Sequence, residues 1–191
     1  MPENAAECIL RGMYLLRPTS RKGKGPRVQL LGSGTILREV IAAADLLEND
    51  WNVSADVWSA TSMTELRRDG LANERWNMLH PGAKPRVPYV TQCLEGRAGP
   101  VVAATDYIKA YSDQIRPYLP KDRVYKVLGT DGYGRSDSRA KLRGFFEVDR
   151  HYATVAALAA LAERGEVKPK IVSEAIGKYG LDPEKPNPVT V

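Results

Sequence analysis

A short stretch of the chain, Gly129 to Arg139 (GTDGYGRSDSR), combines glycines with charged side chains directly after the apolar run VYKVL. That run predicts a buried strand, and open α/β sheets bind ligands at the carboxyl ends of their strands. The stretch is therefore a candidate for an active-site loop or for a contact surface to another domain or protein. Its candidate contact residues are Asp131, Tyr133, Arg135, Asp137 and Arg139.

The same stretch also has a purely structural interpretation. Gly132 and Gly134 permit backbone angles that other residues avoid. Asp137 or Ser138 stands where it can cap the helix that follows, and the arginines of the stretch would then pair with its aspartates. Composition alone favours this structural role over catalysis.

A second candidate site is the turn in LGSGTIL, which joins a predicted strand to a predicted helix through Gly32, Ser33, Gly34 and Thr35. Backbone N–H groups and the helix dipole can hold an anion at such a point. The third glycine of a dinucleotide-binding motif would fall at Leu37, and no lysine follows as in a P-loop. A tight turn with Thr35 as the helix N-cap is the favoured interpretation, and a weak anion site is the alternative.

The residue types that usually build metal sites and catalytic triads are scarce. The chain has two histidines, His80 and His151, and two cysteines, Cys8 and Cys93, far apart in the sequence. It contains neither a C-x-x-C nor an H-E-x-x-H pattern. The sequence therefore predicts no metal site and assigns no catalytic or cofactor-binding residue. Both thiols are expected to be buried, reduced and unpaired.

Short apolar runs alternate with amphipathic segments and predict the elements that position these sites. Helices are expected after each of four predicted strands, which are residues 27–31, 54–61, 99–105 and 123–130. Ser62 and Glu65 have the capping-box spacing at the start of the second helix. This alternation predicts a three-layer α/β fold, in which a mostly parallel, mixed sheet has helices on both faces. Residues 13–16 would add an antiparallel edge strand.

The rest of the chain predicts further helices and one long connection. Asp149 is expected to cap a helix that ends at Gly165, and Pro169 to stand in the first turn of another. The proline-punctuated tract 75–90 is expected to be a long connection that either lines a partner surface or wraps the domain. We expect a single domain over residues 1–191, with a lead-in at 1–11 and a proline-rich tail at 182–191.

Several segments of the chain carry a resemblance to a known family. They are VQLLGSGTILREV, SMTELRRDG, ERWNMLHP, PRVPYV, ATDYIKAYSDQIRPYLP, VLGTDGYGRSDSR and FFEVDRHY. Together, and in this order, they resemble the C-terminal domain of the homodimeric bacterial pyruvate dehydrogenases, the first component of the pyruvate dehydrogenase complex. The resemblance implies a transketolase-type C-terminal domain. Met1 falls within the family's continuous sequence, so we expect the chain to be a piece of a longer polypeptide.

The resemblance implies that thiamine diphosphate and Mg²⁺ are cofactors of the full-length enzyme, bound by its other domains. The family's cofactor motif, G-D-G followed at a distance by asparagine, is missing: Thr130 precedes Asp131 and Gly132, and no asparagine lies between Asn77 and Asn187. The implied reaction is oxidative decarboxylation of pyruvate with acetyl transfer to a lipoyl group. The isolated chain is expected to be inactive.

The resemblance also implies protein partners. The chain is expected to pack against the remaining domains of its polypeptide and the second subunit of a homodimer. Alternatively, the segments 129–139 and 75–90 dock the dihydrolipoyl acetyltransferase component or another protein. A third alternative is a small-anion regulatory site, which requires the turn at 32–35 to lie near the glycine-rich stretch.

Composition agrees with a folded, soluble domain. Hydrophobic residues make up 43% and charged residues 27% of the chain, and the net charge is +5. The basic residues are spread out except in the stretch 17–27, which argues against nucleic acid as a partner. The N-terminus is acidic, and the longest apolar runs fall well short of the roughly 20 residues that span a bilayer. We expect a cytoplasmic protein that does not bind membranes.

Overall fold

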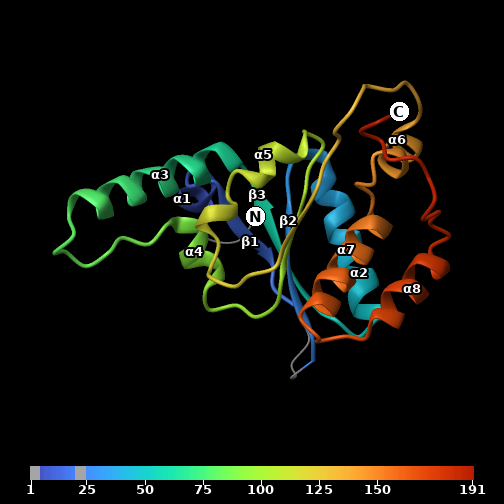
Figure 1. Cartoon of the computed structure of the whole chain (residues 1–191), viewed down its shortest axis with the longest axis horizontal. Coiled ribbons are helices and arrows are strands. Elements are labelled where there is room, and N and C mark those ends of the chain that lie inside the picture. Colours follow the sequence, from blue (N-terminus) through green and yellow to red (C-terminus); the bar gives the residue numbers. More distant parts are fainter. Residues whose placement is uncertain (1–4, 20–24) are drawn as a thin grey trace.

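The computed structural model describes residues 5–19 and 25–191, which form a five-stranded sheet between two layers of helices (Figure 1). The strands are β1 (Met13–Arg17), β2 (Arg27–Gly32), β3 (Ser54–Ala60), β4 (Val101–Ala104) and β5 (Tyr125–Leu128). Their order across the sheet is β1-β3-β2-β4-β5, and all neighbours are parallel except β1, which is antiparallel to β3. The predicted fold and its antiparallel edge are confirmed. The centre of the basic stretch 17–27 lies outside the described residues.

One face of the sheet is covered by α2 (Leu37–Asp50), α7 (Arg150–Glu163) and α8 (Pro169–Lys178), on the right of Figure 1. The apolar stripe expected on α2 is confirmed, because Val40, Ala44 and Leu47 are buried in the core cluster of this face. Asp149 caps α7 as predicted by accepting hydrogen bonds from two backbone N–H groups, and Gly165 follows the helix with φ +70°.

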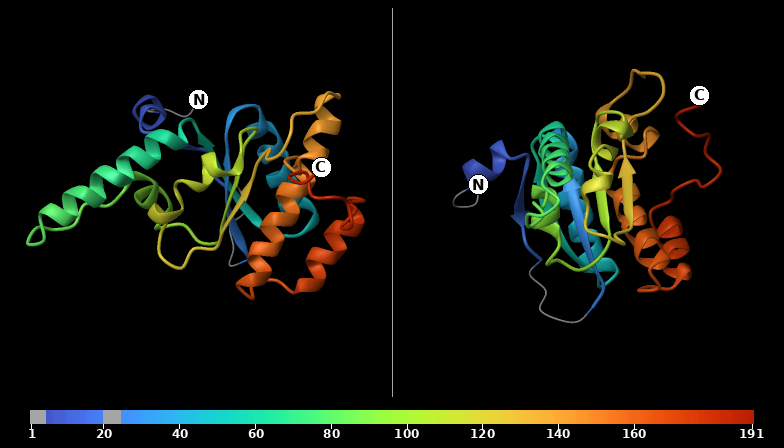
Figure 2. Two further views of the ribbon diagram at one scale, coloured as in Figure 1. Left: turned by 45° about the horizontal axis from the view of Figure 1, so that its top comes forward. Right: turned by 60° about the vertical axis from the view of Figure 1, so that its left-hand side comes forward.

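The opposite face carries α1 (Ala5–Leu10), α3 (Met63–Leu79), α4 (Tyr89–Leu94) and α5 (Lys109–Asp113), followed by a 3₁₀ turn at Arg116–Tyr118. The right-hand view of Figure 2 shows the sheet lying between these helices and those of the first face. The Ser62 hydroxyl accepts a hydrogen bond from the Glu65 N–H, which confirms the predicted start of α3. None of the helices in the described ranges is long and apolar enough to cross a membrane.

Three boundaries on this face differ from the sequence-based expectation. The helix α3 runs on to Leu79, and its last turn is held by hydrogen bonds between Asn77 and the backbone of Arg86. The helix α4 begins directly after Pro88, although the tract 81–90 was expected to be non-helical. The helix after β4 is limited to α5, whose first residue, Lys109, donates its N–H to the Asp131 carboxylate.

A buried polar network interrupts the apolar core of this second face. Gln29 on β2 lies opposite Asp56 on β3, and its amide nitrogen donates to the Asp56 carboxylate at 3.0 Å. The same carboxylate accepts hydrogen bonds from the Thr19 N–H at 2.9 Å and from Arg97 at 3.2 Å. The Trp58 indole N–H donates to the Gln29 carbonyl oxygen at 2.9 Å. These polar groups are therefore paired, as buried polar groups need to be.

Candidate functional site

The glycine-rich stretch leaves β5 at the carboxyl edge of the sheet and leads into α6 (Arg139–Phe145). Its first residues are bound to the segment between β4 and α5. The Thr130 N–H donates to the Tyr107 carbonyl at 2.9 Å, and the Thr130 hydroxyl donates to the Asp106 carbonyl at 2.7 Å. Asp131 accepts from the Lys109 N–H at 3.2 Å. Asp131 therefore holds the backbone at the start of α5 in place.

The structural interpretation of this stretch holds in part. Gly132 has φ +101°, a region that favours glycine, and Ser138 is the N-cap of α6. Gly134 does not have a positive φ, so that expectation is wrong. The expected pairing of arginines with aspartates is also wrong for the described residues, because Asp137 pairs with Lys141 at 3.7 Å.

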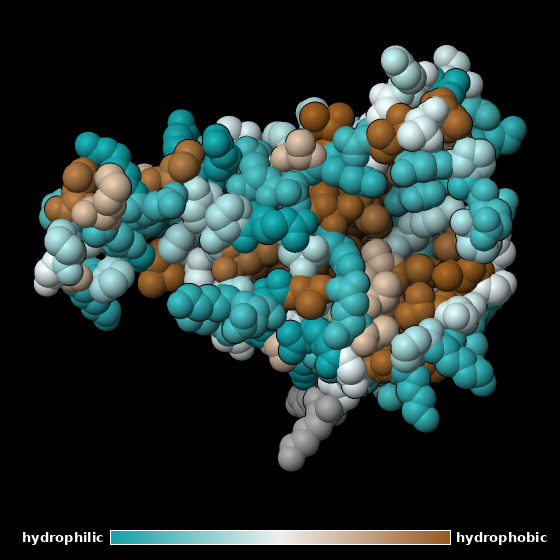
Figure 3. Space-filling model, viewed as in Figure 1, coloured by the Kyte–Doolittle hydropathy of each residue, from teal (hydrophilic) through white to brown (hydrophobic). Residues whose placement is uncertain are grey.

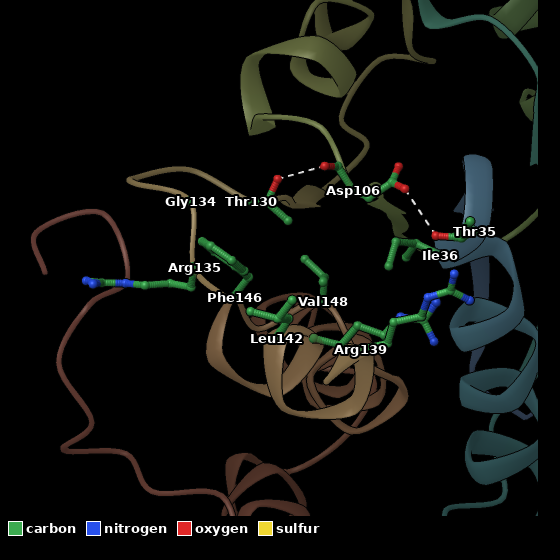
Figure 4. A pocket seen from close by; sticks show the side chains of 11 residues that line it. Thr35, Ile36, Asp106, Thr130, Gly134, Arg135, Arg139, Leu142, Phe146 and Val148 are labelled. Atoms are coloured by element: carbon green, nitrogen blue, oxygen red, sulfur yellow. Dashed lines mark hydrogen bonds between the residues drawn. The ribbon is translucent and has the colours of Figure 1, made fainter. Parts of the chain in front are cut away.

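Two further candidate contact residues, Tyr133 and Arg135, are exposed. The side chain of Tyr133 is exposed, with 77% of its surface accessible. The Arg135 guanidinium lies 5.4 Å from the centre of the Phe145 ring, and in Figure 4 this side chain points away from the neighbouring cavity. Tyr133 and Arg135 are thus available for contact with another surface, and their role as contact residues stays a proposal.

The C-terminal tail contacts this stretch, because the Pro188 carbonyl lies against Gly132. The Lys185 ammonium group donates to the carbonyls of Gly144 and Phe145, the last turn of α6, and also pairs with Glu147. Unpaired carbonyls at a helix end are stabilised by a cation in this position. The tail is therefore held in place at Lys185 and again where Pro188 meets Gly132.

Replacing Gly132 by alanine is expected to displace the tail. A Cβ at this position would lie well under 3.0 Å from the Pro188 carbonyl oxygen, and the positive φ adds strain. We expect Gly132→Ala to lower the free energy of unfolding by about 1–3 kcal/mol and to expose residues 181–191 to protease. Limited proteolysis and urea denaturation measure both effects. Gly134→Ala is the matched control, because open space surrounds that glycine, and equal behaviour of the two variants would contradict the contact.

The turn at 32–35 meets the carboxylate of Asp106, which follows β4. The Thr35 hydroxyl donates to Asp106 Oδ2 at 3.1 Å, and Asp106 Oδ1 lies against Gly34, which has φ +55°. The expectation that Thr35 caps the helix is wrong, because Thr35 lies within a 3₁₀ turn (Gly34–Ile36) and uses its hydroxyl as a donor. A carboxylate of the chain thus occupies the position where a weak anion site was expected.

A cavity of about 330 Å³ lies between this turn, the Asp106 segment and α6 (Figure 4). Thr35 and Ile36 line it on one side, and Gly134, Arg135 and Arg139 on the other. Thr35 of the turn at 32–35 and the glycine-rich stretch therefore line one cavity at the carboxyl edge of the sheet, although β4 lies between β2 and β5. Sequence reasoning missed Asp106, although an aspartate directly after a predicted strand was a usable signal.

Glu39 binds two arginines beneath this cavity. Its carboxylate pairs with Arg143 of α6 at 2.8 Å and with Arg150 of α7 at 2.9 Å. Burial disfavours the charged form of Glu39, but the hydrogen bonds and charges of the two arginines outweigh it and lower the pKa of Glu39 below its ordinary value. Sequence reasoning missed Glu39 as well, since nothing local marks a glutamate on an amphipathic helix as buried.

Histidines and cysteines serve structural roles where the structure describes them. His80 stacks on Trp76, with ring centres 4.3 Å apart, and His151 stacks on Tyr179 at 4.7 Å. Cys8 and Cys93 are unpaired as expected, but each is only half-buried. The described residues contain no group of three side chains suited to hold a metal ion.

A projecting arm is formed by the second half of α3 and the returning segment 80–88 (Figure 1). Asn77 braces it, because its side chain donates to the Arg86 carbonyl and accepts from the Arg86 N–H. The Arg86 guanidinium lies 4.1 Å from the centre of the Trp76 ring. Apolar surface gathers at the end of the arm in Figure 3, and its exposed large apolar residues are Leu71, Met78, Leu79 and Val87.

Comparison with known proteins assigns the fold to a family. The family model described as "Transketolase-like TK C-terminal domain" matches residues 12–149. Transketolase from Leishmania mexicana superimposes with a TM-score of 0.53 and 17% identity, over 85% of this chain and 20% of that chain. A split-gene transketolase, described as an inactive β4 tetramer, gives a TM-score of 0.51 and 14% identity, over 80% and 43% of the two chains. The chain belongs to the family of transketolase-like C-terminal domains.

Within that family, the curated relatives are pyruvate dehydrogenase E1 components. The one from Pseudomonas aeruginosa is 64% identical over 99% of this chain and 21% of its own length. Those from Cupriavidus necator and Escherichia coli K12 are 56% and 55% identical, over 100% and 98% of this chain and 21% of each relative. The chain thus spans about a fifth of the length of these relatives and matches their C-terminal part. The resemblance seen in the sequence is confirmed.

Proposed function

We propose that this chain works as the C-terminal domain of a pyruvate dehydrogenase E1 polypeptide and packs against the catalytic domains and the second subunit. The identity of 64% with the Pseudomonas aeruginosa E1 component, over nearly the whole chain, carries this proposal. The parent reaction is oxidative decarboxylation of pyruvate, with transfer of the acetyl group to the lipoyl group of the acetyltransferase component. That component and the other domains are its partners, in the cytoplasm.

The described residues do not fit the cofactors of that reaction. Mg²⁺ requires several oxygen ligands, and the described part of the chain offers no cluster of acidic side chains. Asp131, the aspartate of the only Asp-Gly pair in the glycine-rich stretch, is already bound to the Lys109 backbone. The residues that hold thiamine diphosphate and Mg²⁺ therefore belong to the other domains in this proposal, and the role of this chain is packing.

A domain exchange tests the proposal. The C-terminal fifth of the E1 component of Pseudomonas aeruginosa, which matches this chain, would be deleted, and this chain would be joined in its place. We expect the truncated enzyme to be inactive and the chimera to oxidise pyruvate with an artificial electron acceptor. The isolated chain should show no heat of binding with thiamine diphosphate and Mg²⁺ and no turnover. An inactive but folded chimera, or turnover by the isolated chain, would count against the proposal.

A second candidate function, docking of the acetyltransferase component, is favoured by the projecting arm. Met78 is 71% exposed at its end, and contiguous exposed apolar surface marks protein interfaces. A pull-down with the subunit-binding domain of the acetyltransferase tests this function. Retention that is lost in a Met78→Asp, Leu79→Asp double variant would support docking through the arm, whereas an arm that packs within the E1 dimer predicts no retention by the isolated chain.

A further inference from the structure

The cavity at the carboxyl edge of the sheet lies where the strand order changes direction. β2 has β3 on one side and β4 on the other, and the connections after β2 and β4 form two of the cavity walls. Ligands of open α/β sheets bind at such switch points, because the two connections diverge there and leave a crevice. The cavity volume of about 330 Å³ falls in the range of small-molecule sites.

The floor of the cavity is apolar. Ile36 and Val148 are almost fully buried, and Leu142 and Phe146 are partly buried beside them. In Figure 4 the side chains of Ile36, Leu142, Phe146 and Val148 gather around the same space, from the α2 side and the α6 side. Apolar surface of this kind is stabilised by an apolar body that displaces water from it.

Polar groups of opposite charge stand on facing walls of the cavity. On the β4 side, Asp106 Oδ2 accepts from Thr35, and no donor to Oδ1 is found in the described ranges. On the α6 side stands the Arg139 guanidinium, for which the described carboxylates provide no ion pair. Arg143 differs, because Glu39 already neutralises it. Asp106 Oδ1 and the Arg139 guanidinium, both on exposed side chains, are thus open to water or to a ligand at the rim.

We propose that this cavity binds a small carboxylate that carries an apolar side chain and a hydroxyl or ammonium group. The carboxylate pairs with Arg139, the hydroxyl or ammonium group donates to Asp106, and the apolar side chain covers the floor. An inorganic anion at the turn 32–35 would face the Asp106 carboxylate, and one at Arg139 would leave the apolar floor uncovered. The proposal concerns residues of this chain alone and does not depend on the packing role proposed above.

Titration of the isotope-labelled chain with 3-phenyllactate, followed by backbone amide NMR, tests the proposal. This probe has the carboxylate, the hydroxyl and the apolar body. We expect saturable shifts at Thr35, Thr130 and Val148 with a dissociation constant of about 1 mM, the affinity of a fragment-sized ligand. Phenylalanine replaces the hydroxyl by an ammonium group, and binding of either compound supports the proposal. Inorganic phosphate and benzyl alcohol, which carry only the anion or only the apolar body, should each bind at least about tenfold more weakly.

Two substitutions test whether Arg139 binds the carboxylate of the probe. Arg139→Gln removes the proposed cation from an exposed position and should weaken phenyllactate binding about tenfold, the effect of one charged hydrogen bond. Arg75→Gln, on the projecting arm far from the cavity, should leave it unchanged. The proposal fails if the cavity residues show no saturable shift at about 20 mM probe, if Arg139→Gln binds as well as the original chain, or if phosphate alone matches phenyllactate.

Discussion

Gly99→Ala is expected to prevent stable folding. Gly99 has φ +94°, and a Cβ there would lie well under 3.0 Å from the carbonyl group of Arg27, at the start of β2. Neither the strand nor the backbone before β4 can move without breaking the hydrogen bond from the Gln29 N–H to the Pro100 carbonyl, 2.9 Å long. We expect a loss of at least about 4 kcal/mol, a large part of the roughly 5–15 kcal/mol by which ordinary domains are stable.

Soluble yield, circular dichroism and urea denaturation measure this loss. Gly96→Ala is the matched control in the same connection, because no atom lies within 4 Å of its added Cβ. The control should stay within about 0.5 kcal/mol of the original chain. If Gly99→Ala unfolded as late in urea as Gly96→Ala, the close approach of the two backbones at this point would be refuted.

Removing the buried carboxylate of Glu39 is expected to have the second largest effect. Glu39→Gln leaves Arg143 and Arg150 without a counter-charge, although both arginines keep partial access to water. We expect a loss of about 2–4 kcal/mol at neutral pH, close to that of a broken buried ion pair. Because Glu39 joins α2 to α6 and α7, the loss should also loosen the wall of the cavity. Glu163→Gln, at a half-exposed pair with Lys126, is the control and should cost less than about 1 kcal/mol.

The same carboxylate predicts a pH dependence with a definite sign. The folded state lowers the pKa of Glu39, so its contribution is fully present above the ordinary glutamate pKa of about 4.3. The contribution disappears as the pH falls through the lower pKa of the folded state, because protonation breaks both ion pairs. The difference in unfolding free energy between the original chain and Glu39→Gln should therefore shrink on acidification. A difference that stays constant from neutral pH to about pH 3 would contradict this account.

Local patterns were sufficient to predict the sheet and most of its helices. The spacing of Ser62 and Glu65 predicted the start of α3, and the apolar stripe of residues 36–47 predicted the buried face of α2. The end of α3 could not be predicted in this way, because a projecting arm is held by contacts between Asn77 and Arg86, nine residues apart. The start of α5 also depends on a distant contact, since Asp131 of another connection accepts a hydrogen bond from the N–H of Lys109, its first residue.

In the candidate site, too, some features could be predicted from the sequence, whereas contacts between distant residues could not. The sequence predicted that the turn at 32–35 and the glycine-rich stretch meet at one edge, because the carboxyl ends of parallel strands meet there. It did not predict that Asp106 occupies the turn, or that Glu39 holds α6 through Arg143. Both contacts join residues far apart in the sequence, and each depends on how two connections pack. Such pairings follow from tertiary structure and leave no local periodicity.

The hydrogen bond between Gln29 on β2 and Asp56 on β3 favours the observed register of these two strands. A slip of β3 by a single position would turn each of its side chains to the opposite face of the sheet. Such a slip would turn the Asp56 carboxylate towards the aliphatic cluster under α2, away from Thr19 and Arg97. A buried carboxylate without donors costs several kcal/mol, so misaligned sheets are penalised far more than aliphatic packing alone would penalise them. The network therefore adds to the preference of β2 and β3 for the observed register.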